Sequence, residues 1–208
     1  MYTPAHFQET DQAAIETLVD HNPFATLVTH TSEGLIANHL PLLRQEGGAL
    51  IGHIALANDL HRMVADGGEV LAIFHGEDSY ISPNWYPTKA ETHKAVPTWN
   101  YQVVHMHGRI SFDHGRKAKL AAVGKLTKRH EEALNGAGGW RMADAAADYL
   151  ETMLGNIVAL RIDVDRVLAK SKLSQNRANA DFDAVAGKME KAGMARLAVR
   201  MAELRKNR

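Results

Sequence analysis

The sequence predicts a closed or nearly closed β-barrel with peripheral helices, an α+β protein. Many short β-rich runs lie between turn residues, and only a few segments place apolar residues at helical spacing. The length of 208 residues suits one domain or a domain with a small appendage. We expect residues 1–180 to form the barrel domain and residues 181–208 to form a basic amphipathic C-terminal helix.

Turn chemistry sets the ends of the predicted strands. Ser32-Glu33-Gly34 lies between two β-rich runs, which therefore form a hairpin. Pro83 cannot donate a ladder hydrogen bond, so the strand before it ends there, and a loop follows to Pro97. The strands expected in this way are residues 24–29, 35–43, 49–55, 70–74, 79–82, 99–112 and 157–164.

Helical spacing is clearest near the N-terminus. Thr10 or Asp11 can cap a helix, because their side-chain oxygens accept from unpaired amides. The apolar stripe that follows consists of Ala14, Ile15, Leu18 and Val19. Further helices are expected at residues 58–66, 116–134, 143–154 and 183 to about 205, the last weakened by Gly193.

Composition narrows the classes of function. Lysine and arginine together number 24, as do aspartate and glutamate, so the formal net charge is zero. No overall field therefore attracts nucleic acid or a membrane surface. The chain has no cysteine, which excludes disulfides and thiolate chemistry. It has neither a signal-peptide pattern nor an apolar run of the roughly 20 residues that span a bilayer, so we expect a cytoplasmic protein.

The densest group of polar donors is the run KLSQNR at residues 172–177, which follows the last predicted strand. Two cations and three short polar side chains suit a phosphate, since each anionic oxygen accepts several charge-assisted hydrogen bonds. A polar loop explains the run as well. The chain has no Walker loop, dinucleotide fingerprint or nucleophile elbow, so a phosphate would need side chains and loop amides.

A series of short motifs extends in order from residue 1 to about 180. They are MYTPAHF at 1–7, NPFATLV at 22–28, HLPL at 39–42, GHIA at 52–55, AN at 57–58, YISPNWY at 80–86, VPTWNY at 96–101 and the run at 172–177. In this order they resemble the PaiB family of FMN-binding negative transcriptional regulators. Asn84 stands where the family usually has Ser, and Ala159 where it usually has Gly.

The resemblance implies the split-barrel fold of the pyridoxamine-phosphate-oxidase-like flavoproteins. In that fold two barrels form a homodimer, and each of two FMN sites is built from both subunits. Trp99 and Tyr101 would provide the wall for the isoalloxazine, and Lys172 and Arg177 would hold the phosphate. The other expected FMN contacts are His39, Leu40, Pro41, His53, Asn58, Asn100, Ser174, Gln175 and Asn176.

Several of these residues have plainer explanations. By itself, Trp99 is better explained as a core or interface aromatic, and a buried structural hydrogen bond explains Asn100 as well as a ligand contact does. His39 and His53 could simply pack. His105 and His107 lie on one face of a predicted strand, but no third ligand accompanies them, so we expect no metal.

The implied function is that of an FMN-binding homodimer of the regulator type. The alternative is an FMN-dependent oxidoreductase with an unknown small substrate, although no group of residues names that substrate. A flavin-binding module with neither activity is a third reading. No catalytic residue is assigned.

The expectation for DNA binding depends on the basic segment at residues 183–208. Gly193 could separate two short helices, the minimal layout of a helix-turn-helix. The alternative is a packed helix that buries Met189, Leu197 and Met201. We favour packing, since each such side chain gains roughly 1.5–3 kcal/mol on full burial. DNA is accordingly a weakly supported partner.

Overall fold

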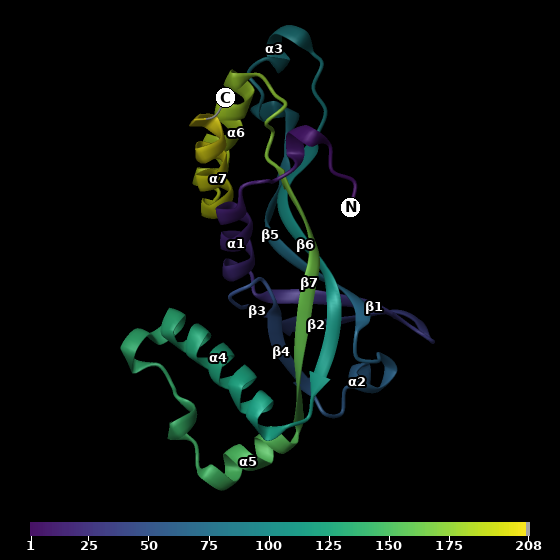
Figure 1. The fold of residues 1–208 in the computed structure, drawn as a ribbon. Coiled ribbons are helices and arrows are strands. Elements are labelled where there is room, and N and C mark those ends of the chain that lie inside the picture. The colour runs from purple at the N-terminus through teal and green to yellow at the C-terminus, as the bar shows by residue number, and fades with distance from the viewer. Residues whose placement is uncertain (207–208) are drawn as a thin grey trace. The chain divides into compact units, whose positions relative to one another are not determined.

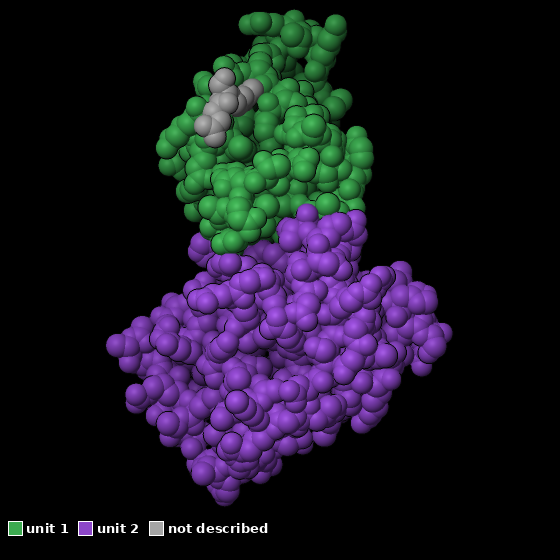
Figure 2. Space-filling model, in the orientation of Figure 1, with its two compact units in different colours: residues 1–18, 75–104, 168–208 green, residues 19–74, 105–167 purple. Residues whose placement is uncertain are grey.

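The computed structural model describes residues 1–206 and contains two compact units, drawn in different colours in Figure 2. Unit 1 comprises residues 1–18, residues 75–104 and the segment from 168 to the C-terminal end. Unit 2 comprises residues 19–74 and 105–167. Each unit is therefore assembled from segments that lie far apart in the sequence.

A seven-stranded antiparallel sheet provides the framework, with strand order β2-β1-β5-β6-β7-β4-β3. Its strands are β1 (Phe24–Thr31), β2 (Gly34–Pro41), β3 (Leu43–Arg44), β4 (Leu50–Ala55), β5 (Gly68–Ile81), β6 (Thr98–Asp113) and β7 (Ile157–Lys172). The three long strands β5, β6 and β7 (Figure 1) contribute residues to both units.

Unit 2 holds the barrel. The predicted hairpin is confirmed, since Thr31 pairs with Gly34 at its tip, and Gly34 takes the left-handed φ of 104° that its turn requires. β2 also contacts β4, so the two ends of the sheet approach each other. Gly52 allows this approach, because a Cβ there would lie 3.0 Å from the Pro41 carbonyl oxygen. The predicted β-barrel with peripheral helices is thus confirmed.

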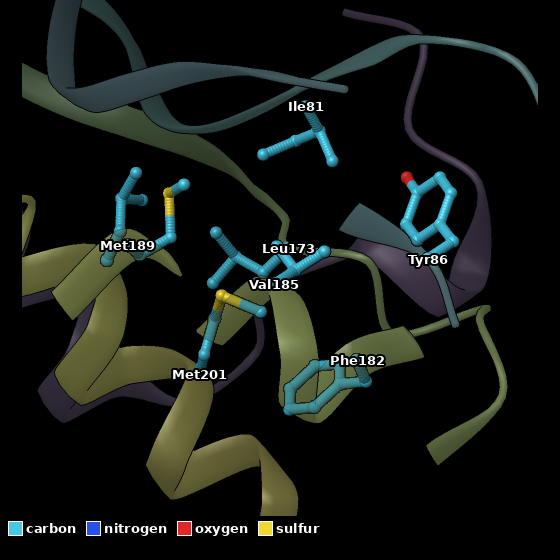
Figure 3. Packing of buried hydrophobic residues seen from close by; sticks show 8 residues of the cluster. Ile81, Tyr86, Leu173, Phe182, Val185, Met189 and Met201 are labelled. Carbon is cyan, nitrogen blue, oxygen red and sulfur yellow. The ribbon is translucent and has the colours of Figure 1, made fainter. Parts of the chain in front are cut away.

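Unit 1 contains the C-terminal helices α6 (Asn179–Lys191) and α7 (Ala195–Lys206). Figure 3 shows the side chains of Val185, Met189 and Met201 directed toward Leu173 and Ile81. Leu197 belongs to the same buried cluster. The predicted burial of Met189, Leu197 and Met201 is therefore confirmed.

The remaining helices are short or lie at the edges of the units. They are α1 (Gln12–His21), α2 (Leu60–Met63), α3 (Lys89–Thr92), α4 (Arg116–Asn135) and α5 (Ala147–Gly155). In unit 2, α4 packs on β4 (Figure 1). Nowhere in residues 1–206 is a helix both long and apolar enough to cross a membrane.

Two strands are longer than the sequence predicted. The expected strands 70–74 and 79–82 are one strand, β5, and Gly76 lies within it. A Cβ at Gly76 would lie 3.3 Å from Gln102, so glycine allows β5 and β6 to lie close together there. The strand expected to end at Val164 continues to Lys172. The charged residues Asp165 and Arg166 are exposed, so they do not end the strand.

Three helices differ from their predictions. The expected tail helix is two helices, since Gly193 has a φ of 76°, which an α-helix cannot contain. The helix expected at 58–66 is only α2, because Val64 is already extended. The helix expected at 143–154 is a 3-10 turn, Met142–Asp144, followed by α5. The predicted loop after Pro83 contains a 3-10 turn and α3.

Candidate functional site

One face of the sheet in unit 1 collects aromatic and basic side chains. We call Tyr80, Trp99, Tyr101, Lys170 and Lys172 the aromatic–cationic face. Trp99 and Tyr101 are two residues apart on β6, as are Lys170 and Lys172 on β7, so each pair points to one side. The Tyr80 and Trp99 rings meet edge to face at 6.0 Å, and the Lys170 Nζ lies 5.2 Å from the Tyr101 ring centroid.

The aromatic part of this face is open to solvent. Trp99 is 52 % exposed and Tyr80 is 49 % exposed. Exposed aromatic side chains are uncommon in a packed core and frequent where a ligand or a partner binds. In the described structure Trp99 is therefore not the core aromatic that the sequence left open.

Lys172 ties the basic part of the face to the aromatic part. Its Nζ donates to the Trp99 carbonyl oxygen at 2.7 Å and to the Thr98 hydroxyl. Burial lowers the pKa of Lys172, and the positive charges of Lys170 and Arg177 lower it further. The ammonium is therefore costly to keep charged in the absence of an anion.

Lys170 is a candidate site residue that the sequence did not indicate. It is 8 % exposed, and its Nζ donates to the Tyr2 carbonyl oxygen at 3.2 Å and lies 5.7 Å from the Tyr2 ring. Neither Lys170 nor Lys172 forms an ion pair with a carboxylate within residues 1–206. The alternation of Lys170 with Lys172 is a signal, but the predicted strand ended too early to place both on one face.

Three of the expected FMN contacts hold the turn after β7. The Ser174 hydroxyl, at a left-handed φ of 64°, donates to the Asn100 Oδ1 at 3.0 Å, and both residues are buried. The Gln175 side chain accepts from the Leu173 amide at 2.7 Å and donates to the Ser171 carbonyl. Asn100, Ser174 and Gln175 thus position Lys172, and direct contact of these three with FMN stays a prediction.

The end of the run is more accessible. Asn176 is exposed, and the Arg177 guanidinium lies 4.7 Å from the ring centroid of the buried Tyr86. A guanidinium over an aromatic face is a cation–π contact.

The other expected contacts belong to unit 2. His39 is exposed on β2, and its Nδ1 lies 3.1 Å from the Thr26 hydroxyl. Leu40 is buried, and the carbonyl of Pro41 faces Gly52 where β2 approaches β4. The strand can therefore offer backbone groups and the His39 ring, while Leu40 belongs to the core.

His53 and Asn58 differ in how far their polar atoms are satisfied. The Nδ1 of His53 is buried and has no hydrogen-bond partner within residues 1–206, and burial lowers the pKa of this imidazole, which favours its neutral form. The Asn58 amide donates to Asn38 Oδ1 at 2.7 Å and accepts from the Leu60 amide at 3.0 Å. His53 therefore has a buried polar atom without a partner in the described residues, whereas both polar atoms of the Asn58 side chain are hydrogen-bonded.

The expected FMN contacts thus fall into two groups. Trp99, Asn100, Tyr101 and the run 172–177 come together in unit 1. His39, Leu40, Pro41, His53 and Asn58 belong to unit 2, where Pro41 and His53 lie on strands that contact each other.

His105 and His107 are half-buried on one face of β6. Burial is the main cause that lowers the pKa of both imidazoles. Residues 1–206 contain no group of three or more histidine, cysteine or acidic side chains arranged to hold a metal ion. Both histidines lie on a half-buried face of this strand.

Arg200 in α7 is held by carboxylates. Its guanidinium lies 2.8 Å from Glu9, 3.3 Å from Asp11 and 2.8 Å from Glu203, and both Arg200 and Glu9 are largely buried. Glu9 also accepts from the Ser171 hydroxyl at 2.8 Å. The pair therefore binds α7 to the N-terminal segment and to β7.

Two further carboxylates engage the tail. Asp183 pairs with Arg205 at 2.7 Å. Glu77 of β5 accepts from the Arg196 and Leu197 amides, both at 3.1 Å, and so caps the N-terminus of α7. Two helices joined at Gly193 do have the outline of a helix-turn-helix, but two of the α7 arginines and its N-terminus are already occupied by acidic groups.

Comparison with known proteins identifies relatives across most of the chain. Residues 1–166 match a family model described as "Putative FMN-binding domain". The chain is 33 % identical to "Protease synthase and sporulation protein PAI 2" of Bacillus subtilis, over 88 % of this chain and 86 % of that protein. It is 27 % identical to an uncharacterized protein of Aspergillus fumigatus, over 93 % of this chain and 92 % of that protein. The run at 172–177 lies beyond the matched family model.

Solved structures show the same fold at low sequence identity. The FAD and heme binding protein from Mycobacterium smegmatis superposes with a TM-score of 0.61 at 18 % identity, covering 85 % of this chain and 79 % of that one. The flavocytochrome Anf3 from Azotobacter vinelandii gives 0.58 at 12 % identity, covering 85 % and 75 %. The expected split-barrel fold is thereby confirmed.

Proposed function

The chain belongs to the PaiB family of FMN-binding proteins, and we propose that it is a homodimer that holds the FMN phosphate at Lys172. One observation carries this assignment. Lys170 and Lys172 are desolvated, lie on one strand face and lack a carboxylate partner within residues 1–206. A phosphate dianion supplies the negative charge that the two ammonium groups lack.

The neighbouring side chains suit the rest of the cofactor. The half-exposed indole of Trp99 and the ring of Tyr101 offer a flat wall for the isoalloxazine. Arg177 adds a third cation for the phosphate. FMN supplies electron-transfer chemistry when bound, and the chain supplies binding and orientation.

The proposed homodimer explains the exposed aromatic residues of unit 1. Trp99 and Tyr80 are about half exposed, and Tyr2 is 83 % exposed. A partner subunit that shares the flavin site would cover them, as the family resemblance implies. Contact of FMN with His39, Leu40, Pro41, His53 and Asn58 of unit 2 stays a prediction.

We propose a regulatory role for this flavoprotein in the cytoplasm, of the negative transcriptional regulator type. The support is family membership and the similarity to a Bacillus subtilis protein named for protease synthesis and sporulation. The proposal does not assign DNA contact to α7, because Arg200 and Arg205 are paired with acidic residues. An FMN-dependent oxidoreductase would act through the same site, but no described residue identifies a substrate.

Titration of the purified chain with FMN tests the proposal. We expect one FMN per chain, with a shifted visible spectrum and quenched flavin fluorescence, and a dimer in sedimentation at micromolar concentration. No saturable spectral change, or a stable monomer that binds FMN fully, contradicts it. Oxidation of a nicotinamide by the FMN-loaded protein would favour the oxidoreductase.

A further inference from the structure

A cavity of about 480 Å³ lies in unit 2, between α4 and the segment that folds back over it from residue 136 to residue 142. We call it the α4 cavity. Its volume falls in the range of about 300–1,000 Å³ that is typical of small-molecule sites. Gly124, Thr127 and Lys128 lie on the helix side, and Trp140 and Met142 lie on the returning segment. None of the expected flavin contacts lines it.

Glycines keep this cavity open and well formed. A Cβ at Gly124 would lie 3.4 Å from the Met142 sulfur, so any larger side chain there would enter the space. Glycine is less favourable than alanine in the middle of a helix, and at this position it leaves the wall of the cavity open. At the other end, Gly139 lies so close to α4 that a Cβ would be 3.0 Å from the Glu131 carbonyl oxygen.

Hydrogen bonds hold the returning segment in place. The Glu131 carboxylate accepts from the Trp140 amide at 3.0 Å and from the Asn135 side chain at 2.8 Å. The indole of Trp140 nevertheless remains 45 % exposed while it lines the cavity. A fixed backbone with an uncovered aromatic side chain is a pre-formed wall for a flat ligand.

Two cations, Lys128 and Arg141, and two carboxylates, Glu131 and Glu132, line the cavity, so its charged lining sums to zero. The Lys128 ammonium lies 3.8 Å from Glu132, and the Arg141 guanidinium lies 4.0 Å from Asp144. The Thr127 hydroxyl makes no side-chain hydrogen bond within residues 1–206. An indole, a thioether and one open hydroxyl suit an uncharged aromatic molecule with a single hydrogen-bonding group.

We propose that the α4 cavity is a second ligand site, separate from the flavin contacts, that binds an uncharged planar aromatic molecule. Trp140 stacks on the ligand, Met142 contacts its edge, and the Thr127 hydroxyl bonds to its polar group. The site does not depend on the proposed role of Lys172, since no residue is shared.

The test uses N-phenyl-1-naphthylamine, an uncharged aromatic fluorophore with one N–H donor, added to the full chain saturated with FMN. We expect saturable enhancement of its fluorescence, with one probe bound per chain and no displacement by excess FMN. Gly124→Leu fills the cavity from a helical position and should abolish binding. The matched control Gly187→Leu makes the same change in α6, where a Cβ meets nothing within 4 Å, and should bind like the unaltered chain.

A second variant decides the outcome if Gly124→Leu does not fold. Trp140→Ala removes a half-exposed side chain, so the fold should persist, and the probe should bind about tenfold more weakly. Displacement of the probe by FMN, or equal binding by Trp140→Ala and the unaltered chain, overturns the proposal. Failure of FMN to bind at all would remove the flavin assignment and leave this site untouched.

Discussion

Two groups of basic residues in unit 1 look alike in the sequence and differ in their surroundings. Lys170 and Lys172 lie on β7 with no carboxylate partner within residues 1–206, and their ammonium groups contact carbonyl oxygens and aromatic rings. Arg200 and Arg205 lie on α7 and are each paired with acidic residues. A bound anion would neutralise the two lysines, whereas carboxylates of the chain already neutralise the two arginines.

Whether the cations are paired with carboxylates therefore distinguishes an anion-binding site from a packed helix better than the number of cations does. The tail contains more basic residues than the end of β7, which is why the sequence allows a helix-turn-helix there. Arg200 instead pairs with carboxylates of the N-terminal segment, and Arg205 pairs with Asp183 of α6. The lysines of β7 are fewer, but they remain desolvated and unneutralised, which is the condition that favours anion binding.

The largest expected effect comes from removing the tail. Truncation after Asp181 deletes Phe182, Val185, Met189, Leu197 and Met201, all fully buried. At roughly 1.5–3 kcal/mol each, their loss approaches the whole stability of about 5–15 kcal/mol of a typical domain. We expect the melting temperature, followed by circular dichroism, to fall steeply. Unchanged melting together with loss of salt-sensitive DNA binding would show that the tail is a nucleic-acid arm.

The next effect concerns the paired cations. Arg200→Ala leaves the buried carboxylate of Glu9 without its cation, which should lower the free energy of unfolding by about 3 kcal/mol in urea titrations. Lys188→Ala, an exposed cation in α6, is the control and should change stability by less than about 0.5 kcal/mol. Equal effects of the two changes would mean that the Arg200 pairs add nothing to the packing.

The unpaired cations should behave in the opposite way. Lys172→Gln should weaken FMN binding by about 1.5–3 kcal/mol, the range for hydrogen bonds to charged groups. It should not lower the melting temperature, because it removes a charge that burial and Lys170 disfavour. Calorimetric titration with FMN measures the first effect. A variant that unfolds more easily yet binds FMN normally would assign Lys172 to the scaffold.

The smallest effect is a pH dependence. The pKa of Lys172 is lowered below its usual 10.5, and a bound phosphate should raise it again. FMN affinity should therefore fall as the pH rises through the lowered pKa of Lys172 in the free chain, which lies below 10.5, because the ammonium then loses its proton. Riboflavin provides the control for titration of the ring itself. Lys172→Arg stays charged, so a decline of the same size in this variant would point to another group.

The sequence predicted the architecture well and the ends of its elements less well. The hairpin at Ser32-Glu33-Gly34 and the helix capped near Asp11 depend on local chemistry, so they could be predicted. The continuity of β5 could not, because Gly76 normally signals a turn and its reason lies in Gln102 on another strand. The charged residues Asp165 and Arg166 hid the length of β7 in the same way.

The site could be predicted only in part. The run at 172–177 was found from its donors, but the chain cannot show locally that Ser174 bonds to Asn100, 74 positions earlier. The pairing of Arg200 with Glu9 spans 191 positions and is equally invisible. The fold therefore determines which cations have carboxylate partners. The sequence alone could not predict this for the lysines of β7 or for the arginines of α7.

The most direct measurement compares FMN with riboflavin, which differ by the phosphate, on the unaltered chain and on Lys172→Gln. If Lys172 holds the phosphate, the unaltered chain should bind FMN more tightly than riboflavin by about tenfold or more. In Lys172→Gln that advantage should shrink to a small factor, while riboflavin affinity stays the same. Equal affinity of the unaltered chain for the two flavins, or an FMN advantage that survives the substitution, would contradict the assignment of the unpaired lysines to the phosphate.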